Sequence, residues 1–242
     1  MKFNGIDLRD VHPLVSLDHC GVSGWRRDLR RIEAAKSDLI VGARDVAGEF
    51  FALVNISGRT PEAGEEALAA VRAWAFADGK MHEIDDGKNP GRVLDGILQE
   101  IDEPEMVHGF GTVRIGWALE DVHKRSTAES RAEASGATSL QIVYNGTAEA
   151  YPVFEVAPTA AADEIVLTLD GKPLLRLTER MVTGQHLIMD TSRQLLTLDG
   201  RDVRSQTDWT QTDYDIPLTN GTHELISNVP GILKARWHDR WA

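Results

Sequence analysis

Four pairs of an asparagine or aspartate with a following glycine divide the second half of the chain, namely Asn145-Gly146, Asp170-Gly171, Asp199-Gly200 and Asn220-Gly221. Such pairs favour two-residue turns, because the first residue tolerates a positive φ and glycine adopts one freely. The segment 164–169, which precedes one pair, alternates apolar and polar residues as a half-buried strand does. Because strand-like segments recur at short intervals, the second half is predicted to be an antiparallel β-sandwich.

The first half contains one clear helix signal. Thr60 can cap free amide groups, Pro61 suits the first helical position, and Glu62 faces the positive end of the helix dipole. Apolar residues then recur at spacings of three and four, which predicts a helix over 62–77 with one buried face; these residues are Ala67, Leu68, Val71, Trp74 and Ala75. Asp78-Gly79 is expected to end the helix, because glycine can adopt the left-handed cap.

Strand patterns surround this helix. Residues 49–57, 80–84, 92–101 and 110–119 have strand-like composition, and the last of these segments largely alternates apolar with small or polar residues. Two further segments, 3–9 and 25–32, are expected to be extended and to offer sheet edges for pairing with a neighbouring copy. The predicted fold class is therefore mainly β with one α-helix.

The small, polar segment 126–136 contains no large apolar residue, so it can bury little surface and is predicted to be a linker. It separates an N-terminal α+β domain, residues 1–125, from a C-terminal β-sandwich domain, residues 137–242. No internal repeat relates the two parts.

Composition excludes several classes of protein. The formal net charge is -12, and the one basic cluster, Arg26-Arg27 with Arg30-Arg31, is better explained as a solvated strand or an interface edge than as a nucleic-acid site. No apolar run is long enough for a membrane helix, and the first residues lack the apolar core of a signal peptide. Cys20 is the single cysteine, so no internal disulfide can form.

Candidate catalytic and metal-binding groups are weak. Adjacent strand residues such as His19 and Cys20 point to opposite faces and make a poor dyad. The cluster of His82, Glu83, Asp85 and Asp86 fits a polar turn better than a metal site.

Near the C-terminus, His238-Asp239 has no accompanying serine in a strand–turn–helix elbow. The run Gly109-Phe110-Gly111 lacks the third glycine of a dinucleotide fingerprint and opens a strand. We therefore predict no catalytic, cofactor-binding or metal-binding residues, and no cofactor.

The order of these elements resembles that of siphophage distal tail proteins (Dit). The capped helix is followed by Pro90-Gly91-Arg92-Val93-Leu94-Asp95-Gly96 and by a closing strand, Phe110-Gly111-Thr112-Val113-Arg114-Ile115-Gly116-Trp117. In the second part, residues 187–191, 195–200 and Gly221-Thr222-His223-Glu224-Leu225-Ile226-Ser227 are similar to the family's C-terminal galectin-like sandwich. Asp121-Val122-His123 departs from the family, which often has an Asp-Pro pair after the closing strand.

The resemblance implies a structural virion protein of a long non-contractile tail. Its N-terminal (belt) domains would form a hexameric ring, an adaptor between the tail tube protein and the tail-tip hub or tail-associated protein. A receptor-binding protein is a further candidate partner of the C-terminal domain. The expected location is the distal tail tip or baseplate of the virion, after assembly in the host cytoplasm. The family has no catalytic residues to carry over.

Two other functions remain open from the sequence. The chain could be a carbohydrate-binding β-sandwich of a tail-tip or cell-surface protein, with Trp209, Trp237 and Gln206-Thr207-Asp208 as candidate contacts. It could also be an enzyme that uses an acidic pair such as Asp85 and Asp86 as general acid and base. Specific sugar binding without ring formation would favour the first of these.

Overall fold

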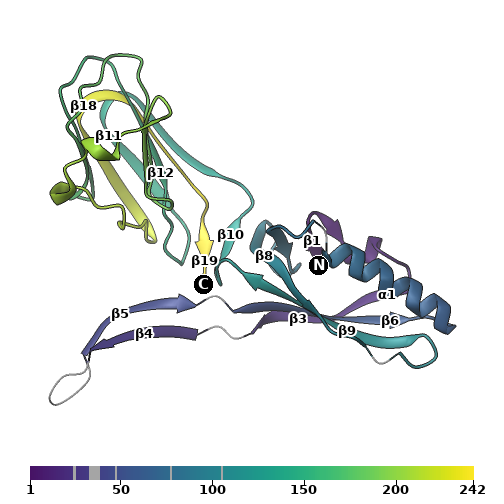
Figure 1. The fold of residues 1–242 in the computed structure, drawn as a ribbon. Coiled ribbons are helices and arrows are strands. Elements are labelled where there is room, and N and C mark those ends of the chain that lie inside the picture. The colour runs from purple at the N-terminus through teal and green to yellow at the C-terminus, as the bar shows by residue number, and fades with distance from the viewer. Residues whose placement is uncertain (24–25, 33–38, 47, 77, 105) are drawn as a thin grey trace. The chain divides into compact units, whose positions relative to one another are not determined.

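Two compact units, Met1–Lys124 and Arg125–Ala242, make up the chain in a computed structural model (Figure 1). Each unit has its own hydrophobic core. Among the described residues, no helix combines the length and the hydropathy needed to cross a membrane. The structure describes residues 1–23, 26–32, 39–46, 48–76, 78–104 and 106–242.

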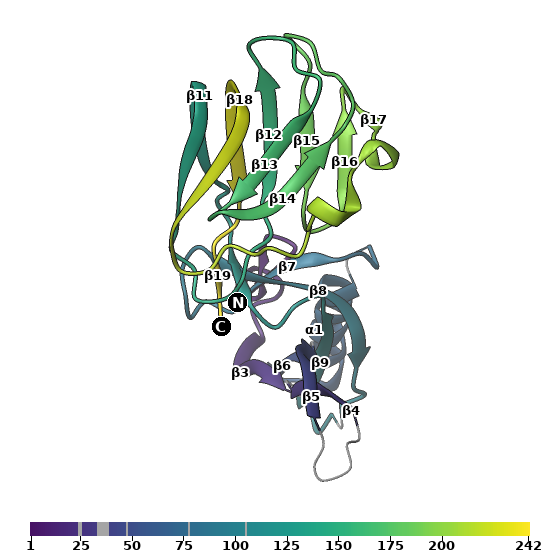
Figure 2. The same ribbon diagram turned by 90° about the vertical axis from the view of Figure 1, so that its left-hand side faces the viewer.

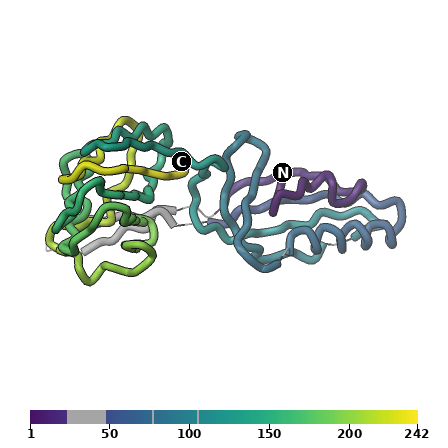
Figure 3. The backbone as a smooth tube through the Cα atoms, turned by 90° about the horizontal axis from the view of Figure 1, so that it is seen from above, coloured from purple at the N-terminus to yellow at the C-terminus, as the bar shows by residue number. Residues whose placement is uncertain are grey.

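Unit 1 is a sheet covered on one face by a single helix (Figures 1 and 3). The strand order is β2-β1-β7-β8-β9-β6-β3, and every neighbouring pair is antiparallel. The elements are β1 (Lys2–Phe3), β2 (Ile6–Asp7), η1 (Leu8–Asp10), β3 (Val15–Ser23), β4 (Arg26–Ile32), β5 (Leu39–Val46), β6 (Glu49–Ser57), α1 (Pro61–Phe76), β7 (His82–Asp85), β8 (Arg92–Ile101) and β9 (Phe110–Leu119).

The predicted strands 49–57, 92–101 and 110–119 are confirmed as β6, β8 and β9. The strand expected at 80–84 begins two residues later, at His82, because Gly79 has a positive φ and the Asp78 carboxylate binds the backbone of Lys80 in a turn.

The helix prediction is confirmed, except that Ala77 lies outside the described residues. The Thr60 hydroxyl accepts a hydrogen bond from the Ala63 amide at 3.3 Å, which satisfies one of the free donors of the first turn. All five residues of the predicted apolar face are buried. They pack on an aromatic group in which the Trp117 ring lies 5.4 Å from Phe3 and 6.0 Å from Trp74. This packing fixes the helix to the sheet.

Three glycines bring backbone into contact with backbone where α1 begins. A Cβ on Gly64 would lie 2.7 Å from the Gly109 Cα, and a Cβ on Gly58 would lie 2.6 Å from the Gly64 amide nitrogen. The Gly58 amide donates to the Gly109 carbonyl at 2.8 Å, and Gly109 has a φ of +87°. Gly109 is therefore required for close backbone packing. This structural role explains the first glycine of the run Gly109-Phe110-Gly111 without a bound dinucleotide.

The expected strand at 3–9 is wrong. Asn4 and Gly5 have φ values of 50° and 75°, so they form a tight turn that joins two-residue strands β1 and β2. Leu8 then begins the short helix η1, where the Asp7 carboxylate accepts from the Arg9 amide at 3.0 Å. Asn4-Gly5 carries the same turn signal as the four pairs of the second half.

The expected strand at 25–32 corresponds to β4, with residue 25 outside the described residues. β4 and β5 form a separate two-stranded antiparallel sheet. The side chains of the arginine cluster in β4 lie outside the described part of the structure.

The eight-stranded sheet of unit 2 is antiparallel throughout, which confirms the β prediction for this half, and its strands lie in two layers (Figure 2). The order is β14-β13-β18-β12-β15-β16-β17, with β11 on the other side of β18. The elements are β10 (Lys124–Ser126), β11 (Ser130–Tyr144), β12 (Val153–Pro158), β13 (Ile165–Leu169), β14 (Lys172–Leu177), β15 (Leu187–Asp190), β16 (Leu195–Leu198), β17 (Arg201–Asp202), η2 (Arg204–Gln206), η3 (Trp209–Gln211), β18 (Gly221–Trp237) and β19 (Arg240–Trp241).

Long strand β18 belongs to both layers. Its residues 225–227 pair with β13, whereas its residues 231–236 pair with β12 on the same side. Pro230 and Gly231 lie at the change of layer, and β11 has its own irregularities opposite, around Ala137. A Cβ on Gly231 would lie 2.5 Å from the Ala157 carbonyl oxygen, so this position needs glycine. Strands bend at such bulges, and here the bend folds one sheet over itself.

Two of the four predicted tight turns are confirmed. Asp170-Gly171 and Asp199-Gly200 have positive φ at both residues and join β13 to β14 and β16 to β17. Asn145-Gly146 is not such a turn: a Cβ on Gly146 would lie 2.1 Å from the Tyr144 hydroxyl, so close packing explains this glycine. Asn220-Gly221 joins no two-residue hairpin either: Asn220 precedes β18, and Gly221, which has a positive φ, is the first residue of that strand.

The predicted linker, 126–136, is largely a strand. Residues 130–136 form the first half of β11 and pair with β18, from Ser130 opposite Trp237 onwards. Small and polar residues suit this position because exposed and half-buried residues alternate along it, with Ala132 and Ala134 packed against the core.

Candidate interaction surfaces

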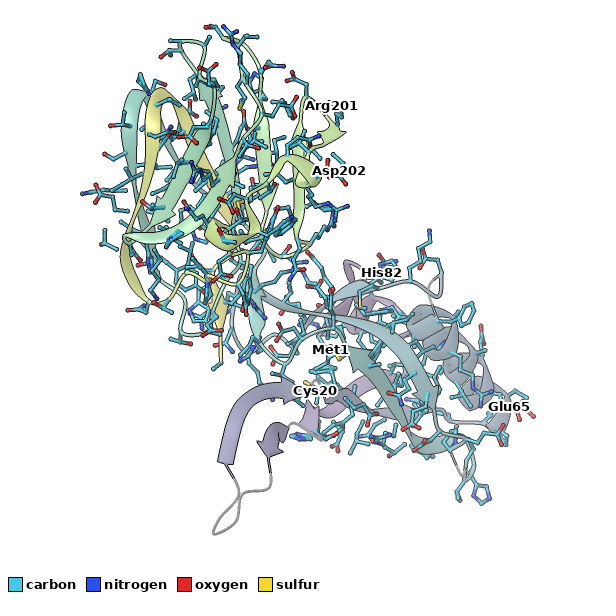
Figure 4. All side chains as sticks on the ribbon, turned by 60° about the vertical axis from the view of Figure 1, so that its left-hand side comes forward. Met1, Cys20, Glu65, His82, Arg201 and Asp202 are labelled. Atoms are coloured by element: carbon cyan, nitrogen blue, oxygen red, sulfur yellow. The ribbon has the colours of Figure 1, made fainter. Side chains whose placement is uncertain are left out.

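His19 and Cys20 lie on opposite faces of β3, as expected for neighbours on a strand. The Cys20 thiol is buried, and burial raises its pKa, so the reactive thiolate is disfavoured. His19 is exposed, with its ring 5.6 Å from that of Phe51. Figure 4 marks Cys20 within the sheet of unit 1.

The acidic cluster around β7 is divided among separate partners. His82 Nε2 lies 2.5 Å from the Asp78 carboxylate, and Lys124 Nζ lies 2.6 Å from Asp86. Asp85 accepts the Gly87 amide at 2.8 Å, as in a turn. Among the described residues, no group of three or more His, Cys, Asp and Glu side chains could hold a metal ion.

The C-terminal pair His238-Asp239 forms hydrogen bonds with residues at the start of unit 2. The Asp239 carboxylate accepts the Trp237 indole N–H at 3.0 Å and the Ser130 hydroxyl at 3.3 Å. His238 Nδ1 lies 2.9 Å from the Ser126 carbonyl oxygen. Trp237 is 5% exposed, so its proposed role as a sugar contact is wrong: its ring is part of the core.

The face of the unit 1 sheet opposite α1 carries a charged cluster. Along β6, the core-facing residues are buried and the alternate residues Glu49, Phe51, Leu53 and Asn55 are half-buried on the opposite face. Arg114 stands opposite Leu53 on β9. Its guanidinium lies 5.7 Å from the Phe51 ring centroid, a cation–π distance.

Two carboxylates enclose Arg114 on this face. Arg114 Nη2 lies 2.6 Å from Glu49 Oε2, and Nη1 contacts Glu100 Oε1. The hydrogen bond with Glu49 is the main cause of the raised pKa of Arg114. The second Glu49 oxygen is buried without a hydrogen-bond partner, and it lies where a Cβ on Gly116 would stand, at 1.9 Å. The cluster thus links the side chains of β6, β8 and β9 on this face of the sheet.

The β4–β5 hairpin is a second distinctive surface of unit 1. Among the described residues, β4 and β5 pair only with each other. Ser23 and Glu49 stand opposite each other at the end of the β3–β6 ladder, and Arg26 stands opposite Val46 at the start of the β4–β5 ladder. The hairpin therefore continues the β3–β6 ribbon beyond the helix-covered sheet (Figure 1).

A pocket of about 370 Å³ lies in unit 2 among loops near β15, β17 and the two short helices. Its lining residues are Gln194, Arg204, Ser205, Trp209 and Tyr214. Asp208 caps η3 by accepting the Thr210 amide at 3.0 Å, which orients the neighbouring Trp209. The Asp213 amide donates to the Leu174 carbonyl at 3.1 Å and places Tyr214 beside it.

Sequence reasoning selected Trp209 but missed its pocket neighbours. Gln206 and Asp208 are half-buried and Thr207 is buried, so the loop that was expected to make contacts mainly supports Trp209. Gln194 comes from the turn after β15, and its φ of 53° is uncommon for a residue other than glycine. No signal in the sequence connects these separate loops.

A family model for the C-terminal domain of siphovirus-type tail components matches residues 145–241. None of the curated proteins matches the chain. Among eight matching solved chains, the crystal structure of phage SPP1 Dit aligns with a TM-score of 0.76 and 16% identity, and covers 100% of this chain and 98% of that one. That protein is described as a paradigm of the hub adsorption apparatus in phages that infect Gram-positive bacteria.

Two structures of the phage P2 baseplate in its activated conformation, with calcium and with strontium, are less similar. Both have a TM-score of 0.43 and cover 93% of this chain and 90% of theirs, at 10% and 9% identity. The resemblance to siphophage distal tail proteins is confirmed by the family model over residues 145–241 and by the SPP1 Dit fold over the whole chain.

Proposed function

We propose that this phage tail protein, which has a siphovirus-type tail component domain and the fold of a distal tail protein, forms a closed ring at the tip of a non-contractile tail. The ring is a structural adaptor between the tail tube and the tail-tip hub of the baseplate, and it holds six copies. Its role is to assemble, not to catalyse. The C-terminal sandwich, for which a galectin-like form stays a prediction, is the part available to a receptor-binding protein.

The observation that carries this proposal is the β4–β5 hairpin. An isolated two-stranded hairpin is at best marginally stable in water, and its open edges invite pairing with another chain. A neighbouring copy would cover those edges. Because each copy would offer its hairpin and receive another, the contact is head-to-tail, and such contacts close into rings when the rotation allows.

Charge supports a contact between copies. The sequence of β4 is Arg26-Arg27-Asp28-Leu29-Arg30-Arg31-Ile32, whereas the chain as a whole carries a formal net charge of -12. A basic strand is electrostatically complementary to an acidic copy of the same protein, which favours the encounter. Because exposed charges are screened by salt, ring formation should weaken as ionic strength rises.

The test is the mass of the purified full chain by light scattering on a sizing column, with negative-stain images of the same peak. A six-fold ring with a central opening is expected. A monodisperse monomer, both alone and in the presence of the tail tube protein, would contradict the ring.

A second variant tests the hairpin. Ser23 and Glu49 face each other in the ladder, so a two-residue Asn-Gly turn in place of residues 24–48 can close the β3–β6 ribbon. The shortened chain should be a folded monomer, with buried Trp117 reporting the intact core by fluorescence. If it still forms rings, the hairpin does not close them.

A further inference from the structure

The pocket of unit 2 presents an exposed aromatic surface. Trp209 is 56% exposed, and its ring centroid lies 5.9 Å from that of Tyr214 at an interplanar angle of 34°. Among the described residues, Trp209 is the one tryptophan that is largely exposed. A ligand that covered this ring would gain the favourable free energy of burying its apolar surface.

The charges at the pocket cancel. Arg204 forms several contacts with the Asp202 carboxylate, including Nη2 to Oδ2 at 2.6 Å and Nε to Oδ2 at 3.0 Å. These hydrogen bonds lower the pKa of Asp202 to about 2, so the pair stays ionised and neutral overall at physiological pH. Figure 4 marks Asp202 at the surface of unit 2. An anion would have to compete with this carboxylate, so the pocket favours an uncharged ligand.

The hydroxyl of Tyr214 is unsatisfied. Tyr214 is 6% exposed, and its buried oxygen has no hydrogen-bond partner. Leaving a buried polar group unpaired is unfavourable, and a hydrogen bond with a ligand hydroxyl would remove that penalty. Ser205 and Gln194 add exposed polar side chains to the same lining. The pocket thus combines a flat apolar surface with several groups that bind hydroxyls.

We propose that this pocket binds a neutral saccharide, with one sugar ring stacked on Trp209 and its hydroxyls bonded to Tyr214, Ser205 and Gln194. A sugar ring has an apolar C–H face and a polar rim, which matches an aromatic surface bordered by hydrogen-bonding groups. The volume of about 370 Å³ lies in the range of small-molecule sites, roughly 300–1,000 Å³. A protein partner normally needs a far larger contact area, about 800 Å² on each side.

The test is saturation-transfer NMR on the full chain with glucose, galactose and N-acetylglucosamine at millimolar concentration, and with glycerol 3-phosphate as the anionic comparison. Transfer to the ring protons of at least one neutral sugar is expected. Trp209→Ala should weaken that binding by about tenfold or more, because it removes the stacking surface. Trp209→Phe keeps an aromatic face and should retain most of the affinity.

Matched variants separate the pocket from general effects. Tyr214→Phe should weaken binding several-fold, whereas Tyr151→Phe, which removes a hydroxyl bonded to Asp215 at 3.2 Å outside the pocket, should not. Val182→Ala changes another exposed apolar residue of unit 2 and serves as the control for Trp209→Ala. The mass of the ring should be unchanged in all of these variants. The sugar-binding proposal and the ring proposal are therefore tested independently.

Three results would overturn the proposal: no transfer to any neutral sugar, binding of glycerol 3-phosphate alone, or sugar binding that Trp209→Ala leaves unchanged.

Discussion

Replacing Gly64 by alanine should destabilise unit 1, although the same change stabilises most helices. Gly64 lies in the first turns of α1, where alanine is favoured over glycine by about 1 kcal/mol. The added Cβ, however, would lie 2.7 Å from both the Cα and the carbonyl oxygen of Gly109, and 2.9 Å from Met106 Cε. The methionine methyl group can move, but the Gly109 backbone is held by its hydrogen bond with Gly58.

The magnitude follows from these two opposing effects. Overpacking typically costs about 1–3 kcal/mol, and contact with fixed backbone places this site near the upper limit. Subtracting the gain in helix propensity leaves a net loss of about 2 kcal/mol in the free energy of unfolding. For a unit of this size, 1 kcal/mol corresponds to roughly 4 °C, so the melting temperature should fall by about 8 °C.

Thermal unfolding of the full chain, followed by calorimetry, measures this effect in the transition assigned to unit 1. Glu65→Ala is the matched control, because Glu65 is the next helix residue and is exposed (Figure 4). It should change the melting temperature little. A Gly64→Ala variant that melts at the same temperature as the wild type, or higher, would show that the three-glycine contact does not constrain the helix.

Three further changes should alter stability. Tyr144→Phe should cost unit 2 about 1–2 kcal/mol in denaturant unfolding, because the hydroxyl donates to Ala148 at 2.5 Å and accepts from Arg240 at 3.1 Å. Gly171→Ala should cost about 1–2 kcal/mol through its φ of +76° alone, since nothing lies within 4 Å of the new Cβ. Hydrogen bonds from His82 to Asp78 and from Arg204 to Asp202 lower both carboxyl pKa values from 3.8 to about 2. Because these folded-state values lie below the unfolded ones, their stabilisation is complete above about pH 4 and is lost as the pH falls towards 2. Melting temperatures measured over that range should therefore decline, and less steeply in Asp202→Asn.

Sequence signals predicted those parts of the fold that depend on interactions between residues close together in the chain. Thr60, Pro61 and Gly79 predicted both ends of the helix, because caps and fixed φ angles act over a few residues. Strand-like composition predicted the bounds of β6, and a largely alternating pattern predicted those of β9.

The sequence predicted less well those parts of the fold that depend on contacts between residues far apart in the chain. Gly146 carries a turn signal, yet its position is explained by the Tyr144 hydroxyl against which it packs. The small residues at the start of β11 indicate a linker when the sequence is considered alone. In the structure they form a strand because β18 pairs with them.

The candidate surfaces were predicted even less completely. Trp209 was identified because aromatic faces can stack on sugars, but Gln194 and Tyr214 reach the same pocket from other loops. The charged cluster of Arg114, Glu49 and Glu100 joins three strands, and nothing in their spacing indicates that they meet.

The pairing of β11 with β18 is expected to form late in folding. It joins the long strand that opens the sandwich with the one that closes it, from Ser130 opposite Trp237 to Tyr144 opposite Gly221. Contacts between residues so far apart in sequence form slowly, because a long loop must close first. During synthesis, β11 therefore waits unpaired until β18 has left the ribosome, whereas unit 1 can already be complete. The exposed edge of β11 is then the segment most open to mispairing in the nascent chain.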